Sequence, residues 1–285
     1  MTALDAALAD AARRLAEAGV PSPQADAELL AGHVLELGRG EVAARALAGA
    51  ELPEAAAIAF WRLVGRRAAR EPLQHLTGVA HFRSLSLRVG PGAFVPRPET
   101  EVVAQFAIDA LAAVAAPEPI AVDLGTGSGA IAIALATEVP HARVYAVELS
   151  PDAFVWAKQN AMAARADNLT LVHGDLADAL PELDGAVDVV VSNPPYIPTG
   201  AIPRDPEVRL HDPELALYGG EDGLDVVRAL EATARRLLRP GGVLVIEHGE
   251  LQGPEIARLL ADAGWRAVAT HPDLVGRPRA TTALR

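Results

Sequence analysis

Short apolar segments alternate with helical segments from Ile120 to the end of the chain, and this order limits the fold more than any other feature. Val, Ile and Leu dominate the apolar segments, which are predicted to be buried strands over residues 120–124, 144–147, 169–172, 187–191 and 243–246. Helical patterns lie between and after these strands, for instance at residues 226–238 and 256–263, and a final strand pair is expected at 265–270 and 281–284. Such alternation predicts an α/β fold, in which helices cover both faces of a mostly parallel sheet.

The chain before this region has a different pattern. Residues 1–73 favour a small helical bundle, because apolar residues recur there at helical spacing. Residues 74–98 are predicted to form a linking β-hairpin, with an alternating strand at 85–89, a turn rich in glycine and proline, and a returning strand at 93–95. Residues 99–285 then form the α/β domain.

Composition narrows the classes of function. The net charge of -12 makes a general nucleic-acid binder improbable, although Arg62, Arg66, Arg67 and Arg70 form either a local basic groove or an ordinary solvated helix face. The chain has no cysteine, which excludes disulfides and thiolate metal sites. No basic segment precedes an apolar run at the start, and no apolar stretch reaches about 18 residues, so a soluble cytoplasmic protein is expected.

The histidines give no metal-ligand spacing. We therefore expect no metal site, and we interpret six of them as loop or surface residues: His75, His81, His173, His211, His248 and His271.

A glycine-rich turn joins the first predicted strand to the helix after it. Asp123–Gly129 has the sequence Asp-Leu-Gly-Thr-Gly-Ser-Gly. Glycines permit a tight turn and a close approach to a ligand, and ligands of open parallel sheets bind beyond the carboxyl ends of the strands. We expect the cofactor to contact Gly125, Thr126, Gly127, Ser128 and Gly129. The spacing also satisfies the dinucleotide fingerprint, so this motif leaves the cofactor open.

Acidic residues follow the next two strands. Glu148 ends the strand at 144–147, where a carboxylate can hold the hydroxyls of a ribose. Asp175 follows the strand at 169–172 and is either an acceptor for an adenine amino group or a turn residue.

The sequence Asn193-Pro194-Pro195-Tyr196 follows the buried strand at 187–191. Two prolines restrict the backbone, and the residue before a proline is confined to extended conformations. Asn193 is therefore expected to be held rigidly at the same edge of the sheet as the glycine turn. A turn without a ligand is the alternative, but its position at this edge favours a functional site.

Together, the glycine turn and the Asn193–Tyr196 motif resemble those of class I methyltransferases that modify amide or exocyclic amino nitrogens. The wider pattern resembles the HemK/PrmC family, which methylates the glutamine of the Gly-Gly-Gln motif in peptide chain release factors. Three further segments carry this resemblance: Arg70–Gly78, Phe94–Glu101 and Leu217–Leu224. The chain differs from the common family pattern in having glutamate at 148 and an aliphatic residue at 176.

The resemblance implies S-adenosyl-L-methionine as cofactor and release factors as protein substrates, with residues 1–73 recognising the substrate. Asn193 and the carbonyl of Pro194 would accept the two hydrogens of the target amide, while Pro195 stiffens the loop and Tyr196 packs on the amide plane. Leu176 would lie beside the adenine. Phe94 and Pro96 would line the methionine end of the cofactor, with Arg97 nearby.

Other functions remain open on the sequence alone. Within the same chemistry, the target is a glutamine of a ribosomal protein or the N6 atom of adenine. An NAD-dependent dehydrogenase would share the glycine turn but has no use for the Asn193 motif. A protein without catalytic activity, such as a cofactor-binding sensor or a ribosome partner, would not need the two amide acceptors of the Asn193 motif, which we call the amide clamp. The oligomeric state, the surface that docks the substrate and the set of release factors served are left undetermined.

Overall fold

The computed structural model describes residues 2–285, which divide into two compact units. Unit 1 contains the chain up to Val79 together with Pro203–His211, and unit 2 contains Ala80–Ile202 and Asp212–Arg285. A segment from the middle of the α/β region therefore folds with the N-terminal helices. The predicted limits at 73/74 and 98/99 stay predictions.

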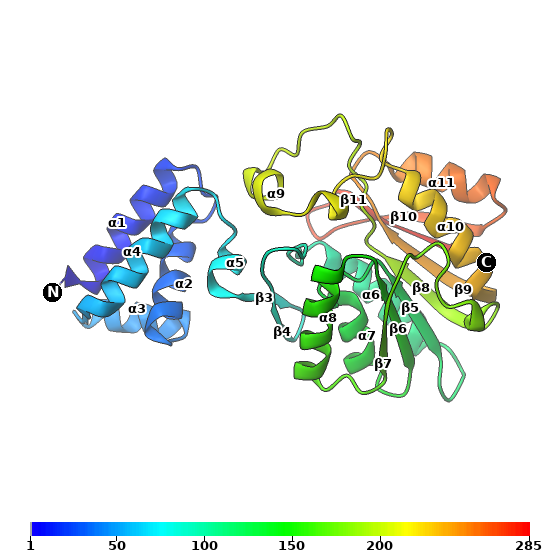
Figure 1. Ribbon diagram of the computed structural model, residues 1–285, viewed down its shortest axis with the longest axis horizontal. Coiled ribbons are helices and arrows are strands. Elements are labelled where there is room, and N and C mark those ends of the chain that lie inside the picture. The colour runs from blue at the N-terminus through cyan, green and yellow to red at the C-terminus, as the bar shows by residue number, and fades with distance from the viewer. Residues whose placement is uncertain (1) are drawn as a thin grey trace. The chain divides into compact units, whose positions relative to one another are not determined.

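Unit 1 is the predicted helical bundle together with helix α9 (Pro206–His211); in Figure 1 its N-terminal helices are blue to cyan and α9 is yellow. Its helices are α1 (Leu4–Glu17), α2 (Pro23–Leu35), α3 (Arg39–Leu47), α4 (Glu54–Ala68), α5 (Leu73–Thr77) and α9, and two short strands, β1 (Thr2–Ala3) and β2 (Glu51–Leu52), pair antiparallel. Leu4, Leu8 and Leu15 are buried with Leu30 and Phe60 in one apolar core. The helical spacing of apolar residues in α1 thus becomes one buried face.

Unit 2 is built on a seven-stranded sheet of order β10-β11-β9-β8-β5-β6-β7. The strands are β5 (Ile120–Leu124), β6 (Arg143–Glu148), β7 (Leu169–His173), β8 (Val187–Ser192), β9 (Leu238–Glu247), β10 (Arg266–Pro272) and β11 (Pro278–Leu284). The five strands from β5 to β9 are parallel to one another, and β10 and β11 add an antiparallel pair at the edge next to β9. All seven predicted strand segments are confirmed.

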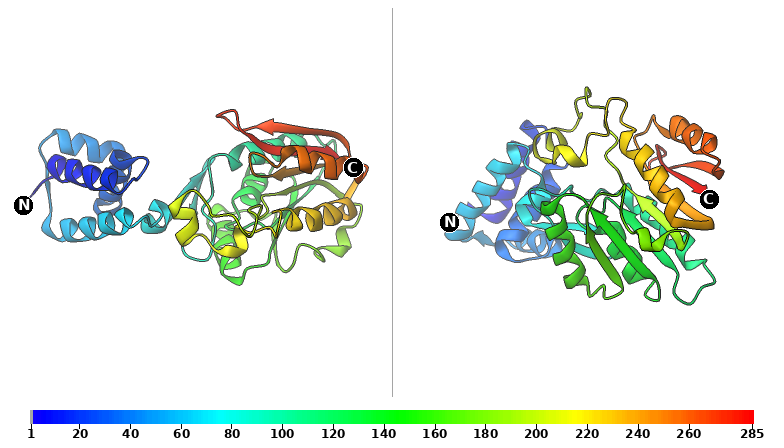
Figure 2. Two further views of the ribbon diagram at one scale, coloured as in Figure 1. Left: turned by 90° about the horizontal axis from the view of Figure 1, so that it is seen from above. Right: turned by 45° about the vertical axis from the view of Figure 1, so that its right-hand side comes forward.

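Helices cover both faces of the sheet, as expected (Figures 1 and 2). On one face, α6 (Thr100–Ala112) and α7 (Ala130–Glu138) share a core with Ala121 and Val191, and α8 (Pro151–Ala164) packs against it. On the other face, α10 (Asp225–Leu237) and α11 (Gly253–Asp262) pack on Val122 and Val190. Neighbouring residues of one strand thus enter opposite cores, because side chains alternate across a strand. Two 3-10 turns complete the unit: η1 (Pro181–Leu183) and η2 (Glu214–Ala216).

The linking hairpin is present and the strand predicted at 85–89 is confirmed, but its partner strand precedes it in the chain and does not lie at 93–95. The hairpin pairs β3 (Val79–Phe82) with β4 (Leu85–Arg88), and Leu73–Thr77 is helix α5. Residues 93–99 form no strand. The prolines at 96 and 98 keep this segment extended while removing backbone N–H donors, so it offers little to a strand ladder. Helix α3 was not predicted, because only Val42 of its residues is buried and the helical spacing is weak.

Across residues 2–285, no helix is both long and apolar enough to cross a membrane.

Candidate active site

The predicted site residues of unit 2 follow neighbouring strands at the carboxyl edge of the sheet. The chain order reverses between β5 and β8, which lie side by side, and ligands of such sheets bind at this switch point. The glycine turn follows β5, Asn193 follows β8 and Glu148 ends β6. The topology therefore gathers motifs from three separate parts of the sequence along one edge.

The glycine turn has the backbone that its sequence predicts. Gly125, Gly127 and Gly129 have φ angles of 76°, 59° and 87°, a region that residues with a side chain rarely adopt. A Cβ on Gly125 or Gly127 would meet no atom within 4 Å, whereas one on Gly129 would lie 2.9 Å from the side chain of Ile133. The first two glycines therefore leave space for a ligand, and the third allows close packing of helix α7.

Two hydrogen bonds fix the carboxylate of Glu148 beside this turn. The backbone N–H of Gly127 donates to Oε2 and that of Ser150 donates to Oε1, both at 2.7 Å. The side chain is buried, with 7% of the residue's surface exposed. Since each carboxylate oxygen can accept more than one hydrogen bond, Glu148 keeps acceptor capacity for a ligand hydroxyl.

The remaining predicted cofactor residues occupy loops. Asp175 is exposed and its Oδ1 accepts the N–H of Ala177 at 2.9 Å, which is the turn role anticipated for it. Leu176 is partly buried against the core. Phe94 and Pro96 are partly buried in the extended segment before α6.

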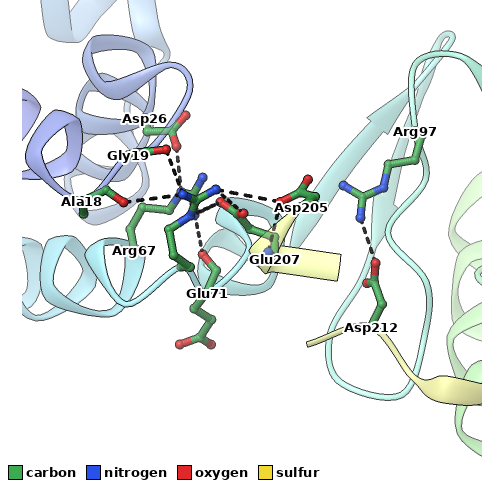
Figure 3. Close-up of polar contacts among 10 residues, drawn as sticks. Ala18, Gly19, Asp26, Arg67, Glu71, Arg97, Asp205, Glu207 and Asp212 are labelled. Atoms are coloured by element: carbon green, nitrogen blue, oxygen red, sulfur yellow. Dashed lines mark hydrogen bonds and ion pairs between the residues drawn. The ribbon is translucent and has the colours of Figure 1, made fainter. Parts of the chain in front are cut away.

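Arg97 has partners within unit 2. Its guanidinium lies 5.0 Å from the ring centroid of Phe94 and forms an ion pair of 2.8 Å with Asp212 (Figure 3). Arg97 was expected near the methionine end of the cofactor, and in this structure its guanidinium is paired with Asp212.

The segment around Gly219 packs against the Asn193 motif and forms backbone hydrogen bonds with it. The N–H of Ile197 donates to the carbonyl of Leu217 at 2.8 Å, and the N–H of Gly219 donates back to Ile197 at 2.9 Å. A Cβ on Gly219 would lie 2.5 Å from the carbonyl oxygen of Pro195, and one on Gly223 would lie 2.4 Å from that of Tyr196. Glycine is therefore required at both positions because the two backbones touch.

A glutamine that the sequence did not single out adds to this support. Gln252 donates from Nε2 to the carbonyl of Tyr196 at 2.9 Å and accepts the N–H of Gly249 at 2.9 Å. Burial raises the pKa of Tyr196 to about 12, so its hydroxyl stays protonated at neutral pH.

Two further residues surround the side chain of Asn193 and were also missed. Its Nδ2 donates to Oγ1 of Thr100 at 3.4 Å, and Thr100 is the first residue of α6. Glu247 ends β9, the strand next to β8, and only 1% of its surface is exposed. The sequence signal that could have identified Glu247 is an acidic residue at the end of a predicted apolar strand.

Two buried carboxyl groups in the site have raised pKa values. Burial raises the pKa of Asp123 to about 7, although the Thr126 hydroxyl and the N–H of Ala132 donate to its Oδ2. Burial also raises the pKa of Glu247 to about 7, against the opposing effects of Thr100 and other neighbours.

The arginines of α4 do not form an open basic groove. Arg67 is buried between Asp26 and Glu207, at 2.7 Å from each carboxylate, and Arg70 also pairs with Glu207 (Figure 3). Arg66 pairs with Glu71, which leaves Arg62 as the exposed member without an ion pair of its own among residues 2–285. The acidic partners are distant in sequence, so the cluster could not be resolved from the spacing.

This arrangement fits the cofactor of a methyltransferase. Open space at Gly125 and Gly127 and a buried carboxylate at Glu148 suit a nucleoside, and a rigid asparagine lies on the adjacent strand. The fold and the site together define a class I methyltransferase that uses S-adenosylmethionine.

Comparisons with known proteins identify the family. Residues 6–78 match the model of the PrmC N-terminal domain, and residues 118–270 match a methyltransferase domain model. The chain is 55% identical to a release factor glutamine methyltransferase of Streptomyces coelicolor, with 100% of this chain and 99% of the relative covered. It belongs to the family of release factor glutamine methyltransferases.

Two other comparisons describe the breadth of the fold. The chain is 43% identical to a 4-amino-L-phenylalanine/4-methylamino-L-phenylalanine methyltransferase of Streptomyces pristinaespiralis, over 93% of this chain and 90% of the relative. A ribosomal protein L11 methylase from Lactobacillus delbrueckii has a similar structure, with a TM-score of 0.50, 22% identity and coverage of 70% of this chain and 84% of that one. The latter shows the shared fold alone.

Proposed function

We propose that this protein transfers the methyl group of S-adenosyl-L-methionine to the side-chain N5 atom of the glutamine in the Gly-Gly-Gln motif of peptide chain release factors. One observation carries the proposal: a rigid Asn193-Pro194-Pro195-Tyr196 motif follows the strand next to the glycine turn, in a chain whose N-terminal helices match the PrmC domain. We propose that release factors are the protein partners of this enzyme and that the reaction takes place in the cytoplasm.

The proposed cofactor site consists of the glycine turn, Glu148, Asp175, Leu176, Phe94 and Pro96. The space at Gly125 and Gly127 supports contact with the cofactor backbone, and the spare acceptor capacity of Glu148 supports binding of ribose hydroxyls. The cofactor supplies a methyl group on a sulfonium, which needs a nucleophile placed in line with it.

The proposed task of Asn193 is to place that nucleophile. An amide nitrogen is a weak nucleophile because its lone pair is delocalised, so orientation accounts for much of the catalysis. Asn193 Oδ1 and the carbonyl of Pro194 accept the two hydrogens of the target amide, which aims the nitrogen and favours the charge that develops on it. The bound cofactor would supply the methyl group and leave as a neutral thioether, and the nitrogen would release its proton to solvent water.

An arylamine substrate is the second candidate, because the relative from Streptomyces pristinaespiralis is a methyltransferase of 4-amino-L-phenylalanine, an amino acid that carries an amine on its ring. An arylamine nitrogen is also planar, delocalised and carries two hydrogens, so the same pair of acceptors suits it. The two substrates differ in size, since one is a protein loop and the other a free amino acid.

The test is incubation of the protein with labelled S-adenosyl-L-methionine and one of four acceptors. These are purified release factor, the same factor with its Gly-Gly-Gln glutamine changed to alanine, 4-amino-L-phenylalanine, and unmethylated duplex DNA. The proposal expects label only in the first, mapped by mass spectrometry to the glutamine side chain. Persistent labelling of the alanine variant, or preference for the arylamine or for DNA, would contradict it.

A further inference from the structure

The side chain of Asn193 has two faces, and the proposed chemistry uses only one. Oδ1 accepts a hydrogen of the target amide, whereas Nδ2 is a donor that must point away from that amide. If the side-chain amide turned over, its N–H groups would face the N–H groups of the substrate. The site therefore needs a device that fixes the orientation of Asn193.

The neighbours of Asn193 provide such a device. Nδ2 donates to Thr100 Oγ1 at 3.4 Å, and both Thr100 and Asn193 present donors to the buried carboxyl of Glu247. Within residues 2–285, Oε2 of Glu247 is buried without a hydrogen-bond partner. A carboxylate is an acceptor only, so it attracts Nδ2 and repels Oδ1.

We propose that Glu247 is a positioning residue for methyl transfer, whose carboxylate holds Nδ2 of Asn193, directly and through the Thr100 hydroxyl, so that Oδ1 faces the target amide. The inference rests on the proposed role of Asn193 as an amide acceptor. A negative charge behind Nδ2 also polarises the Asn193 amide and strengthens Oδ1 as an acceptor, as expected for linked hydrogen bonds.

Ionisation of Glu247 controls this device. When protonated, its hydroxyl can donate to Oδ1 of a reversed Asn193, and the preference for one orientation weakens. Burial raises its pKa to about 7; Glu99 acts in the same direction, while Thr100, Arg279 and Asn193 oppose the shift. Tyr196 is a further titratable neighbour, and its raised pKa keeps it neutral in this range.

His248 follows Glu247 in the chain and is another titratable group near the neighbours of Asn193. Burial lowers the pKa of His248 below its usual value, and its ring nitrogens lie at hydrogen-bond distance from Gly249 and Thr281. The pKa of His248 is therefore shifted in the opposite direction to that of Glu247.

Nuclear magnetic resonance tests the orientation without any catalytic assay. The chain has three asparagines, Asn160, Asn168 and Asn193, so selective ¹⁵N labelling gives three side-chain amides. Asn160 donates to the carbonyls of Arg88 and Ser128, and Asn168 donates to those of Ala136 and Ala142, so both serve as internal references. We expect only the Asn193 signal to shift as the pH passes about 7, and this shift to disappear in Glu247→Gln.

Turnover on release factor provides the second readout. In the wild type, kcat should fall about tenfold from pH 8 to pH 6 as Glu247 becomes protonated. Glu247→Gln keeps the shape but can donate to Oδ1, so its kcat at pH 8 should fall about tenfold and lose this pH dependence. Affinity for S-adenosyl-L-methionine should stay within about twofold. Thr100→Val should lower kcat in the same direction, which gives a second variant if one fails to fold.

Asp188→Asn is the matched control. Asp188 is a buried carboxylate of β8, the strand that leads to Asn193, but it pairs with Arg239 at the opposite end. This variant should keep both the Asn193 titration and the pH profile. An Asn193 signal that does not move, or a Glu247→Gln enzyme with wild-type kcat and pH profile, would overturn the proposal. Failure of the proposed function is distinguishable, because the wild type would then show the titration without labelling release factor.

Discussion

Two buried glutamates, one in each unit, have opposite electrostatic surroundings. Glu207 of unit 1 meets the guanidinium groups of Arg67 and Arg70, with charge-assisted hydrogen bonds to both of its oxygens (Figure 3). Glu247 of unit 2 meets a hydroxyl and an amide, and its Oε2 has no partner among the described residues. Both are well buried, so the difference lies in the partners and not in the exposure.

Their pKa values move in opposite directions. Burial opposes ionisation of Glu207, but hydrogen bonds from Arg70 and Arg67 outweigh it and hold its pKa well below the usual range. Glu207 therefore stabilises the fold above pH of about 4.5, and this stabilisation is lost as the pH falls toward its lowered pKa. For Glu247 the raised pKa means that stability is lost as the pH rises. A buried carboxylate paired with arginines differs in this way from a buried carboxyl without a paired counter-charge.

Removal of Glu207 should have the largest effect on stability. In the described part of the chain, Glu207→Ala leaves Arg70 with only the more distant Asp205, at 3.8 Å, and Arg67 with only Asp26. Breaking a buried ion pair in this way costs about 3–5 kcal/mol. Urea unfolding at pH 7 measures the loss. Glu71→Ala is the control. The ion pair between Glu71 and Arg66 is more exposed than the Glu207 cluster, so its loss should cost less than about 1 kcal/mol. Equal losses for the two variants would mean that the buried pairs of Glu207 stabilise the protein no more than an exposed ion pair does.

The pH dependence of stability should reveal Glu247 directly. Relative to Glu247→Gln, the wild type should lose up to about 3 kcal/mol of unfolding free energy as the pH rises from about 4.5 to about 7. The raised carboxyl stays protonated in the folded protein while it ionises in the unfolded chain. Chemical unfolding of both proteins from pH 4.5 to 8.5 gives the difference, and parallel curves would mean that Glu247 is ionised throughout.

Glu148 represents an intermediate case, a buried carboxylate satisfied by backbone N–H groups. Glu148→Ala removes the proposed acceptor of the ribose hydroxyls and should weaken S-adenosyl-L-methionine binding by about 2 kcal/mol. Calorimetry measures the affinity. Glu138→Ala, at the far end of helix α7 from the glycine turn, should leave it unchanged. Wild-type affinity in Glu148→Ala would remove Glu148 from the cofactor site.

The sequence predicted those parts of the molecule that depend on local pattern. The strands of the sheet follow from apolar runs, and the turn at Gly125–Gly129 follows from glycines that tolerate positive φ. The second strand of the hairpin was misplaced because residues 93–95 have the composition of a strand but no pairing partner.

The rest of the site depends on contacts between distant segments. Thr100, Gln252 and Glu247 are far from the Asn193 motif in sequence, and the fold brings them to it. Thr100 belongs to the Phe94–Glu101 segment, but that segment alone does not show that it meets Asn193. In the same way, the partner of Arg67 and Arg70 comes from helix α9, more than a hundred residues later. Such pairings follow from topology, which spacing in a single sequence does not encode.

Substitution of Asn193 separates cofactor binding from catalysis most directly. Asn193→Ala removes the acceptor while Pro194 and Pro195 keep the loop stiff. On one folded sample, checked by circular dichroism, affinity for S-adenosyl-L-methionine should change by less than about tenfold, or about 1.4 kcal/mol. On saturating release factor, kcat should fall by about a hundredfold or more, as expected for loss of a preorganised hydrogen-bonding group. Asn193→Asp should also be impaired, since its charge can stabilise the ground state as well as the transition state. An Asn193→Ala enzyme that retains most of its kcat would contradict the amide-clamp mechanism.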